Sequence, residues 1–212
     1  MKNDIFMPEN PVNHFLTRIF DLLVLNVLWL ICSIPVITIG ASTAALYTMT
    51  LKWMMGEELP VFKGFFQGFR ANLKQGIFMS LIFLLAMGIL FADFHLLGEG
   101  KMAGSSLMYG FCIVLLVVVL AVFGYAFPLM AKFENTVPQI LNNAWRLAAT
   151  HLPYTGVIVL IQIIPFLWFL FLPSSFMAVF WAWLLFGTAV SAYFCSFFLA
   201  KVFMELIHDS ES

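Results

Sequence analysis

The chain has 212 residues, of which 63% are hydrophobic and 10% charged, with a formal net charge of −1 and a mean hydropathy of +1.00. A soluble protein is typically about 45–50% apolar and about 25% charged. The composition therefore excludes a soluble enzyme fold, a secreted disulfide-rich domain and a nucleic-acid-binding protein, and it predicts a polytopic membrane protein.

The first apolar stretch, Phe15–Met55, is too long to be one membrane helix. A continuous helix of this length would extend about 60 Å, roughly twice the thickness of the hydrocarbon core. Pro35 lies near its middle, where it removes a backbone donor and disfavours helical angles at the residue before it. We therefore predict two spans, at about 15–34 and 38–55, joined by a turn at Pro35.

Residues 60–75 have the pattern of an amphipathic helix in the membrane interface. Apolar side chains recur at helical spacing on one side, and polar or basic side chains recur on the other. The apolar set comprises Phe62, Phe65, Phe66, Phe69 and Leu73, and the polar set comprises Lys63, Gln67, Arg70 and Lys74. A basic face beside an aromatic face suits a helix that lies flat on an anionic leaflet.

The rest of the chain predicts four more spans and a second amphipathic helix. The spans are expected at about 76–97, 107–131, 153–172 and 176–200, and the second amphipathic helix at about 137–151. The predicted fold is an all-α bundle of about six transmembrane helices in a single membrane domain, 1–212. An alignment of Phe69-Arg70 with Trp145-Arg146, at an offset of 76 residues, raises the alternative of a duplicated three-helix unit.

Lysine and arginine residues near the span ends predict the orientation. With a turn at Pro35, nine of the ten basic residues lie on one side, which the positive-inside rule places in the cytoplasm. A single crossing by residues 15–55 would instead leave Lys2, Arg18 and Lys101 outside. We therefore predict six spans with both termini in the cytoplasm.

Four polar residues around the Pro35 break form the first candidate binding site: Asn26, Thr38, Ser42 and Thr43. Asn26 suits a hydrogen bond to another helix, and Thr38 suits the cap of the helix that follows the break. Hydroxyl groups and free backbone donors at a broken helix also line polar sites in transporters. Both interpretations remain open from the sequence.

Small residues follow the same break at helical spacing. Gly40 and Ala44 are four residues apart, as are Ala41 and Ala45, so a neighbouring backbone can approach this face closely. Tight packing within the chain is one reading of this pattern. A homodimer contact through Gly40 and Ala44 is the other.

Four exposed cations form the second candidate site, a contact for a partner or for anionic membrane lipids: Lys63, Arg70, Lys74 and Arg146. They lie on the polar faces of the two predicted amphipathic helices. Simple anchoring of long cytoplasmic loops would explain them equally well from the sequence.

Motifs for common hydrolytic, metal-dependent and ATP-driven chemistry are missing from the sequence. The three cysteines, Cys32, Cys112 and Cys195, are scattered one to each of three apolar segments, without a C-x-x-C pair. Asp21 can pair with Arg18 three residues earlier, and Asp93 and His95, two residues apart, do not share a helix face as an acid–base pair would need. We therefore predict no enzyme activity, no cofactor and no metal site.

The pattern N-x-L-W at Asn26–Trp29, followed by P-x-x-T-x-G-A-S-x-A-A-L-Y at Pro35–Tyr47, resembles the YesL-like family of bacterial integral membrane proteins of unknown function. Residues 65–75 and 142–153 are similar to the same family. The resemblance implies a bacterial cytoplasmic membrane and a gene neighbourhood of carbohydrate ABC importers, glycoside hydrolases and sugar-responsive sensors. It implies no reaction and no catalytic residues.

Two functions follow as expectations. The first is a non-enzymatic accessory protein of carbohydrate uptake or sensing, which contacts an ABC sugar-importer permease or a membrane sensor kinase. The alternative is a small secondary transporter or exporter with a polar site at the broken helix, Pro35–Thr43.

Overall fold

The computed structural model describes residues 11–98, 105–171 and 176–211, and all of its regular elements in these ranges are helices. The predicted all-α class is therefore confirmed for the described part of the chain. In chain order the elements are α1 (Pro11–Ser33), η2 (Val36–Thr38), α2 (Ile39–Met54), α3 (Val61–Gly98), α4 (Ser105–Lys132), α5 (Val137–Thr150), α6 (Leu152–Phe171), α7 (Phe176–Ala182), η4 (Trp183–Gly187) and α8 (Thr188–Glu211).

Several of these helices are long and apolar enough to cross a membrane. Four helical stretches among the described residues meet this condition: His14–Ser33, Val61–Leu97, Ser106–Lys132 and Phe180–Met204. The bent pair α5 and α6 gives a fifth if it is counted as one span. Helix α2 is only 16 residues long. The membrane class is thus supported, and the number of six spans remains a prediction.

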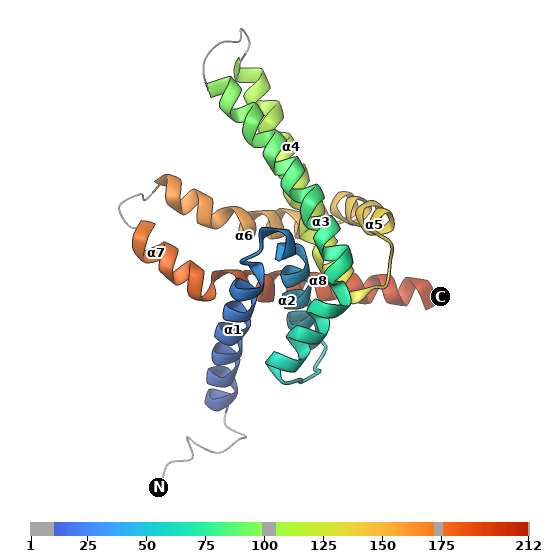
Figure 1. The fold of residues 1–212 in the computed structure, drawn as a ribbon. Coiled ribbons are helices and arrows are strands. Elements are labelled where there is room, and N and C mark those ends of the chain that lie inside the picture. The colour runs from blue at the N-terminus through green and yellow to red at the C-terminus, as the bar shows by residue number, and fades with distance from the viewer. Residues whose placement is uncertain (1–10, 99–104, 172–175, 212) are drawn as a thin grey trace.

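The turn at Pro35 is confirmed. Helix α1 ends at Ser33, a single 3-10 turn follows, and α2 begins at Ile39 and runs back beside α1 (Figure 1). Pro35 itself has φ −73° and ψ 108°, an extended conformation that its ring favours and that no helix continues through. The predicted loops at 98–106 and 172–176 lie mostly outside the described residues, as do the first ten residues.

The predicted interfacial helix at 60–75 and the predicted span at 76–97 are not separate elements. Both belong to α3, which runs without a break for 38 residues from the base of the molecule to the tip of its hairpin with α4 (Figure 1). A helix that lies flat on the membrane and then enters it must turn at their junction. At Gly76, where that turn was expected, the helix continues because the backbone there packs directly on α2.

Helices α2 and α3 pack with almost no side chain between their backbones. A Cβ atom built on Gly76 would lie 2.5 Å from Cα of Ala41, and one built on Gly68 would lie 3.3 Å from Cα of Ala45. Further along, Gly64 of α3 touches the side chain of Met49. Small residues at i, i+4 spacing allow this approach. The tight-packing interpretation of this α2 face is therefore confirmed.

The same contact bears on the homodimer prediction. Gly40 faces Gly76 and Ser80 of α3, and Ala44 is fully buried. This face is occupied within the chain, so it is not open to a second copy. Homodimerisation through another surface stays a prediction.

Helix α5 confirms the predicted helix at 137–151, and it turns through 107° into α6. The hydroxyl of Thr155 lies 3.0 Å from the carbonyl oxygens of both Ala148 and His151, which ties the corner together. The buried face of α5 comprises Ile140, Ala144, Leu147 and Ala148. Helix α5 packs mainly on α4, so this face contacts protein rather than lipid. A duplicated unit would have the same junction between its amphipathic helix and its span in both copies. Helix α3 is continuous at this junction, whereas α5 and α6 are bent, so the junctions give no support to the duplication.

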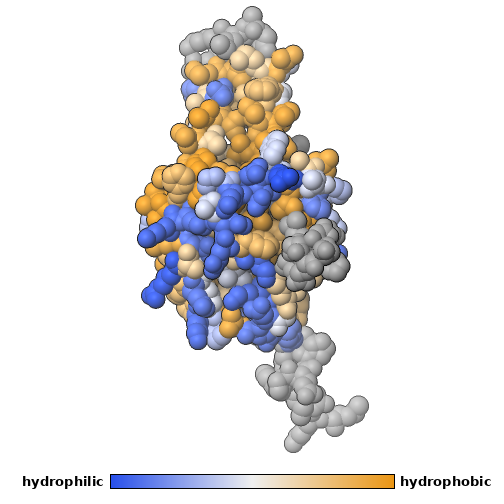
Figure 2. Space-filling view, turned by 90° about the vertical axis from the view of Figure 1, so that its right-hand side faces the viewer, coloured by the Kyte–Doolittle hydropathy of each residue, from blue (hydrophilic) through white to orange (hydrophobic). Residues whose placement is uncertain are grey.

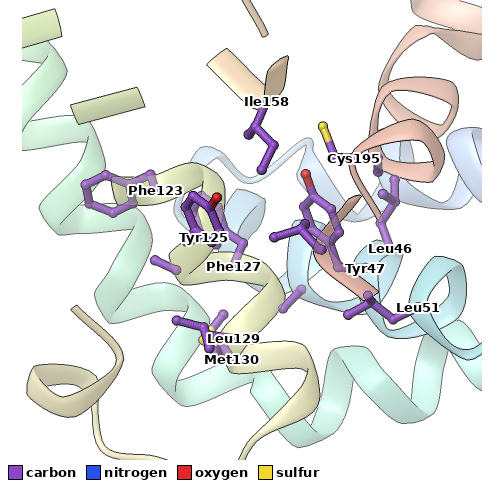
Figure 3. Close-up of a cluster of buried hydrophobic side chains, with 14 of the residues drawn as sticks. Leu46, Tyr47, Leu51, Phe123, Tyr125, Phe127, Leu129, Met130, Ile158 and Cys195 are labelled. Carbon is purple, nitrogen blue, oxygen red and sulfur yellow. The ribbon is translucent and has the colours of Figure 1, made fainter. Parts of the chain in front are cut away.

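The buried core gathers side chains from α1 to α6 and from α8, and its centre lies between α2, α4, α6 and α8. Figure 3 shows Tyr47 and Leu46 of α2 facing Cys195 of α8, with Tyr125 of α4 and Ile158 of α6 beside them. All three cysteines are free thiols.

Apolar side chains cover the outside of the α3–α4 hairpin. Figure 2 shows them in the upper part of the molecule, above a body whose visible face is largely polar. The most exposed of them include Leu85, Phe91, Leu107 and Phe111. An apolar surface of this extent is expected to contact lipid.

The glycine contact predicts a difference between two alanine substitutions on the same helix. Gly76→Ala should destabilise the protein by about 1–3 kcal/mol, because the new methyl group collides with Ala41. Gly88→Ala, where nothing lies within 4 Å of the added atom, should be neutral or stabilising. Thermal unfolding in detergent measures both. Equal melting temperatures for the two variants would contradict the packing.

Candidate functional site

Asn26 joins α1 to the π-helical turn η4. Its side-chain nitrogen Nδ2 donates to the carbonyl of Leu184 at 2.7 Å, and its oxygen Oδ1 accepts from the backbone N–H of Ala189 at 2.9 Å. The side chain is completely buried. The predicted hydrogen bond to another helix is confirmed, and it is made twice.

The position of this amide explains why the helix widens there. Leu184 and Ala189 are five residues apart, which is the spacing of a π-helical hydrogen bond. Asn26 offers one donor and one acceptor to the backbone groups at the two ends of that spacing. A side chain inserted into a helical hydrogen-bond ladder is a recognised cause of such distortions. Asn26 therefore holds η4 in place from a distant part of the chain.

The hydroxyl groups at the Pro35 break bond locally. Thr38 Oγ1 lies 2.6 Å from the carbonyl oxygen of Cys32 and 2.7 Å from that of Pro35, and Ser42 Oγ donates to the carbonyl of Thr38 at 3.1 Å. The expected cap by Thr38 is wrong, since its side chain makes no cap bond. The hydroxyl of Thr38 bonds instead to carbonyl groups that precede α2, those of Cys32 and Pro35.

Helix α3 supplies the missing partner at the start of α2. The N–H of Gly40 donates to Ser80 Oγ at 2.6 Å, and Ser80 Oγ donates in turn to the carbonyl of Gly76 at 2.8 Å. Thr43 Oγ1 accepts a hydrogen bond from Trp29 Nε1 at 3.1 Å. The break is thus closed by bonds within the protein, in keeping with the need to satisfy backbone groups in lipid.

A partly enclosed cavity of about 590 Å³ lies between α2, α3, α4, α6 and the η4–α8 segment. Of the four polar residues predicted to form a site, Thr43 lines this cavity, whereas Asn26, Thr38 and Ser42 do not. The structure therefore does not bring the four together around one space. Asn26 acts on the cavity indirectly, because η4 contributes Trp183 to the wall.

The start of α3 carries a basic and aromatic surface, which we define as Phe62, Lys63, Phe66, Gln67 and Arg70. These residues line an open hollow on the outside of the molecule. Phe62 is 60% exposed and Phe66 is 41% exposed. Phe65, expected on the same apolar face, is instead fully buried, since the glycine side of α3 turns toward α2.

The other predicted cations lie near or beyond this surface. Lys74 is exposed one turn after Arg70 on the same helix, and Arg146 is exposed on α5. Neither lines the hollow. Within the described residues, none of Lys63, Arg70, Lys74 and Arg146 forms an ion pair with an acidic side chain.

Four residues of the cavity wall were not anticipated as site residues: Gln162, Trp183, Thr188 and Ser191. Gln162 is a lone amide in a long apolar segment, and that isolation is a usable signal in a membrane protein. Trp183 begins the π turn and Thr188 follows it, and no local sequence pattern predicts a π turn there.

In the described part of the chain, this arrangement defines a helical membrane protein with a helix break whose hydroxyl groups bond mainly within the protein, an apolar cavity and a basic surface at the start of α3. The family described as "Protein of unknown function, DUF624" matches residues 22–94, from α1 through most of α3. The chain is 30% identical over 143 residues to the "Uncharacterized protein YesL" of Bacillus subtilis (strain 168), which covers 66% of this chain and 67% of that protein.

A second protein of the same bacterium, the "Uncharacterized protein YteU", is 25% identical over 153 residues, covering 70% of this chain and 68% of its own length. No solved structure matches the chain. The chain therefore belongs to the YesL-like family of membrane proteins, whose function is unknown.

The Asn26 bridge predicts a local effect on η4. Asn26→Leu should leave the carbonyl of Leu184 and the N–H of Ala189 without partners, so backbone amides of 183–189 should exchange hydrogen about tenfold faster. Hydrogen exchange followed by mass spectrometry measures this segment. Ser42→Ala is the control, because its hydroxyl bonds only to Thr38. Unchanged exchange in the Asn26 variant would show that the bridge does not hold the turn.

Proposed function

We propose that this protein is a non-enzymatic accessory component of the bacterial cytoplasmic membrane, with six spans and both termini cytoplasmic. It binds a membrane partner of carbohydrate uptake or sensing, either an ABC sugar-importer permease or a sensor kinase. The contact is the basic and aromatic surface of α3. The observation that carries the proposal is a group of cations that have no acidic partner in the described part of the chain and lie beside two exposed phenylalanine rings.

The chemistry of this surface favours a protein contact that includes acidic groups. Lys63 and Arg70 present positive charge next to Phe62 and Phe66. Arginine and aromatic side chains are enriched among residues that dominate binding energy at protein interfaces. Anionic lipid headgroups are also attracted to such a surface, so membrane lipids at its edge would orient the protein without replacing the partner.

The link to carbohydrate comes from the family resemblance rather than from a residue of this chain. Both similar proteins of B. subtilis carry the description "uncharacterized". The absence of an enzymatic description for these relatives agrees with a non-enzymatic role. The partner class is accordingly the part of the proposal that an experiment should address first.

A small secondary transporter or exporter is the second candidate. The cavity favours it, because Thr43 from the segment after the broken helix lines the wall. The hydrogen bonds of Asn26, Thr38 and Ser42 within the protein weigh against a polar transport site at the break. Accessory binding therefore stays the first choice.

Charge reversal on α3 tests the accessory role. The tagged protein is crosslinked in its native membrane, captured in mild detergent and analysed by mass spectrometry. Lys63→Glu with Arg70→Glu should reduce recovery of importer permeases or a sensor kinase by about tenfold or more, because the acidic partner is then repelled.

The matched control is Lys132→Glu with Lys201→Glu, which makes the same change in net charge at two exposed lysines outside this surface. It should leave recovery unchanged. Equal recovery with both double variants would rule out the α3 surface as the contact. Recovery of the protein alone from wild-type membranes would count against the accessory role itself.

A further inference from the structure

The cavity between α2, α3, α4, α6 and the η4–α8 segment has the size and lining of a binding site. Its volume of about 590 Å³ lies within the range of about 300–1,000 Å³ that is usual for small-molecule pockets. Aromatic and aliphatic side chains make up most of the wall, notably Phe83 of α3, Phe123 and Phe127 of α4, and Trp183 of η4.

The wall is uncharged. Its described residues include no Asp, Glu, Lys, Arg or His. A charged group moved into such a space loses its hydration and gains no counter-ion, which is strongly unfavourable. A phosphate or carboxylate is therefore a poor occupant. A free sugar is also poorly matched, because most of its hydroxyl groups would face hydrocarbon.

A few polar side chains converge on this apolar space. Gln162 of α6 and Thr188 and Ser191 of α8 line the cavity, and among the described residues none of their side chains has a hydrogen-bond partner. An amide offers two donors and an acceptor, and a hydroxyl offers one donor and accepts as well. Polar groups inside a membrane protein are costly unless they are paired. These three are available to a ligand.

The backbone near Gln162 makes room for its amide. A Cβ atom on Gly124 of α4 would lie 2.6 Å from Gln162 Nε2 and 2.8 Å from Ile158 Cγ2. The missing side chain at Gly124 therefore leaves room for the amide to lie against α4 at the cavity wall.

The Asn26 bridge holds another part of the cavity wall. The indole ring of Trp183 lies over Gly187, where an added Cβ would come within 2.5 Å of ring atom Cγ. Asn26 fixes the turn that contains both residues. Distorted π turns of this kind occur frequently at functional sites. The cavity wall thus combines the aromatic ring of Trp183, on the turn that Asn26 holds, with the polar amide of Gln162.

We propose that this cavity binds an uncharged, single-chain amphiphile, with its hydrocarbon chain against Phe83, Phe123 and Trp183. Its polar group, a hydroxyl or an ester, bonds to Gln162 and to the hydroxyls of Thr188 and Ser191. The binding site is separate from the α3 surface and does not depend on the accessory role. A two-chain phospholipid is excluded as the occupant because its phosphate has no cationic partner in this wall.

Photolabelling of the purified full-length protein in nanodiscs tests this site. The probe is a monoacylglycerol with a diazirine in its acyl chain, and labelled peptides are identified by mass spectrometry. Label is expected on the cavity-lining segments 116–127 and 183–195. Unlabelled monoacylglycerol should displace it, whereas the fatty acid of equal chain length and a monosaccharide should compete at least about tenfold more weakly.

Two pairs of variants separate the cavity from the outer lipid surface. Leu116→Trp fills the cavity and should abolish labelling of these segments, whereas Val117→Trp, at a neighbouring residue that is 40% exposed and outside the wall, should not. Gln162→Leu removes the amide and should lower labelling by about threefold to tenfold, whereas Asn142→Leu, which removes an exposed amide on α5, should leave it unchanged.

Results with the Leu116 variant, the Gln162 variant and the monosaccharide could each overturn part of the proposal. Labelling that persists in the folded Leu116 variant, or that maps to the exposed residues of the α3–α4 hairpin, would show that the probe binds the outer surface. Unchanged labelling in the Gln162 variant would overturn the assignment of the polar group. Displacement by the monosaccharide would overturn the assigned ligand class.

Discussion

The close contact between α2 and α3 is the constraint on which the rest of the structure depends. Lipid chains are as apolar as leucine, so burial of apolar surface does little to hold two membrane helices together. The attraction between α2 and α3 must therefore come from van der Waals contact, which requires their backbones to lie close together. Gly64, Gly68 and Gly76 of α3 provide it against the small residues of α2. Ser80 then satisfies the free N–H of Gly40 at the end of the contact.

This contact also determines which residues are available for function. With its glycine side against α2, α3 turns Lys63 and Arg70 outward at its start and contributes Phe83 to the cavity wall further on. Asn26 adds a second constraint from α1, because it holds the η4 turn on the other side of the cavity. The outer surface and the inner cavity are therefore two results of one packing arrangement.

Much of the fold could be predicted from the sequence where a single residue type decides the local structure. Pro35 removes a donor, so the break follows from the residue itself, and a lone buried Asn26 needs a partner on another helix. The continuity of α3 could not be predicted in this way. Hydropathy gives little weight to glycine, so the pattern of Phe62, Phe65 and Phe66 suggested one apolar face, whereas the buried face is centred on the glycines.

The cavity could not be predicted because its wall combines residues from several distant elements. Only the isolation of Gln162 in an apolar segment points to it from the sequence. Thr38 is a different case. Its position before α2 favoured a hydrogen bond between its side chain and the start of that helix. Its hydroxyl instead bonds to the carbonyls of Cys32 and Pro35 and makes no bond to an N–H at the start of α2.

The most direct measurement is disulfide formation between α2 and α3 in intact membranes, with Cys32, Cys112 and Cys195 replaced by alanine. A Cβ atom on Gly68 would lie 3.1 Å from Cβ of Thr48, a few tenths of an ångström short of the usual disulfide range. Thr48→Cys with Gly68→Cys should therefore crosslink readily on mild oxidation, and Thr48→Cys with Gly88→Cys should not. Failure of the first pair to crosslink, with both thiols accessible to alkylation, would place residues 60–75 away from α2 and contradict the account.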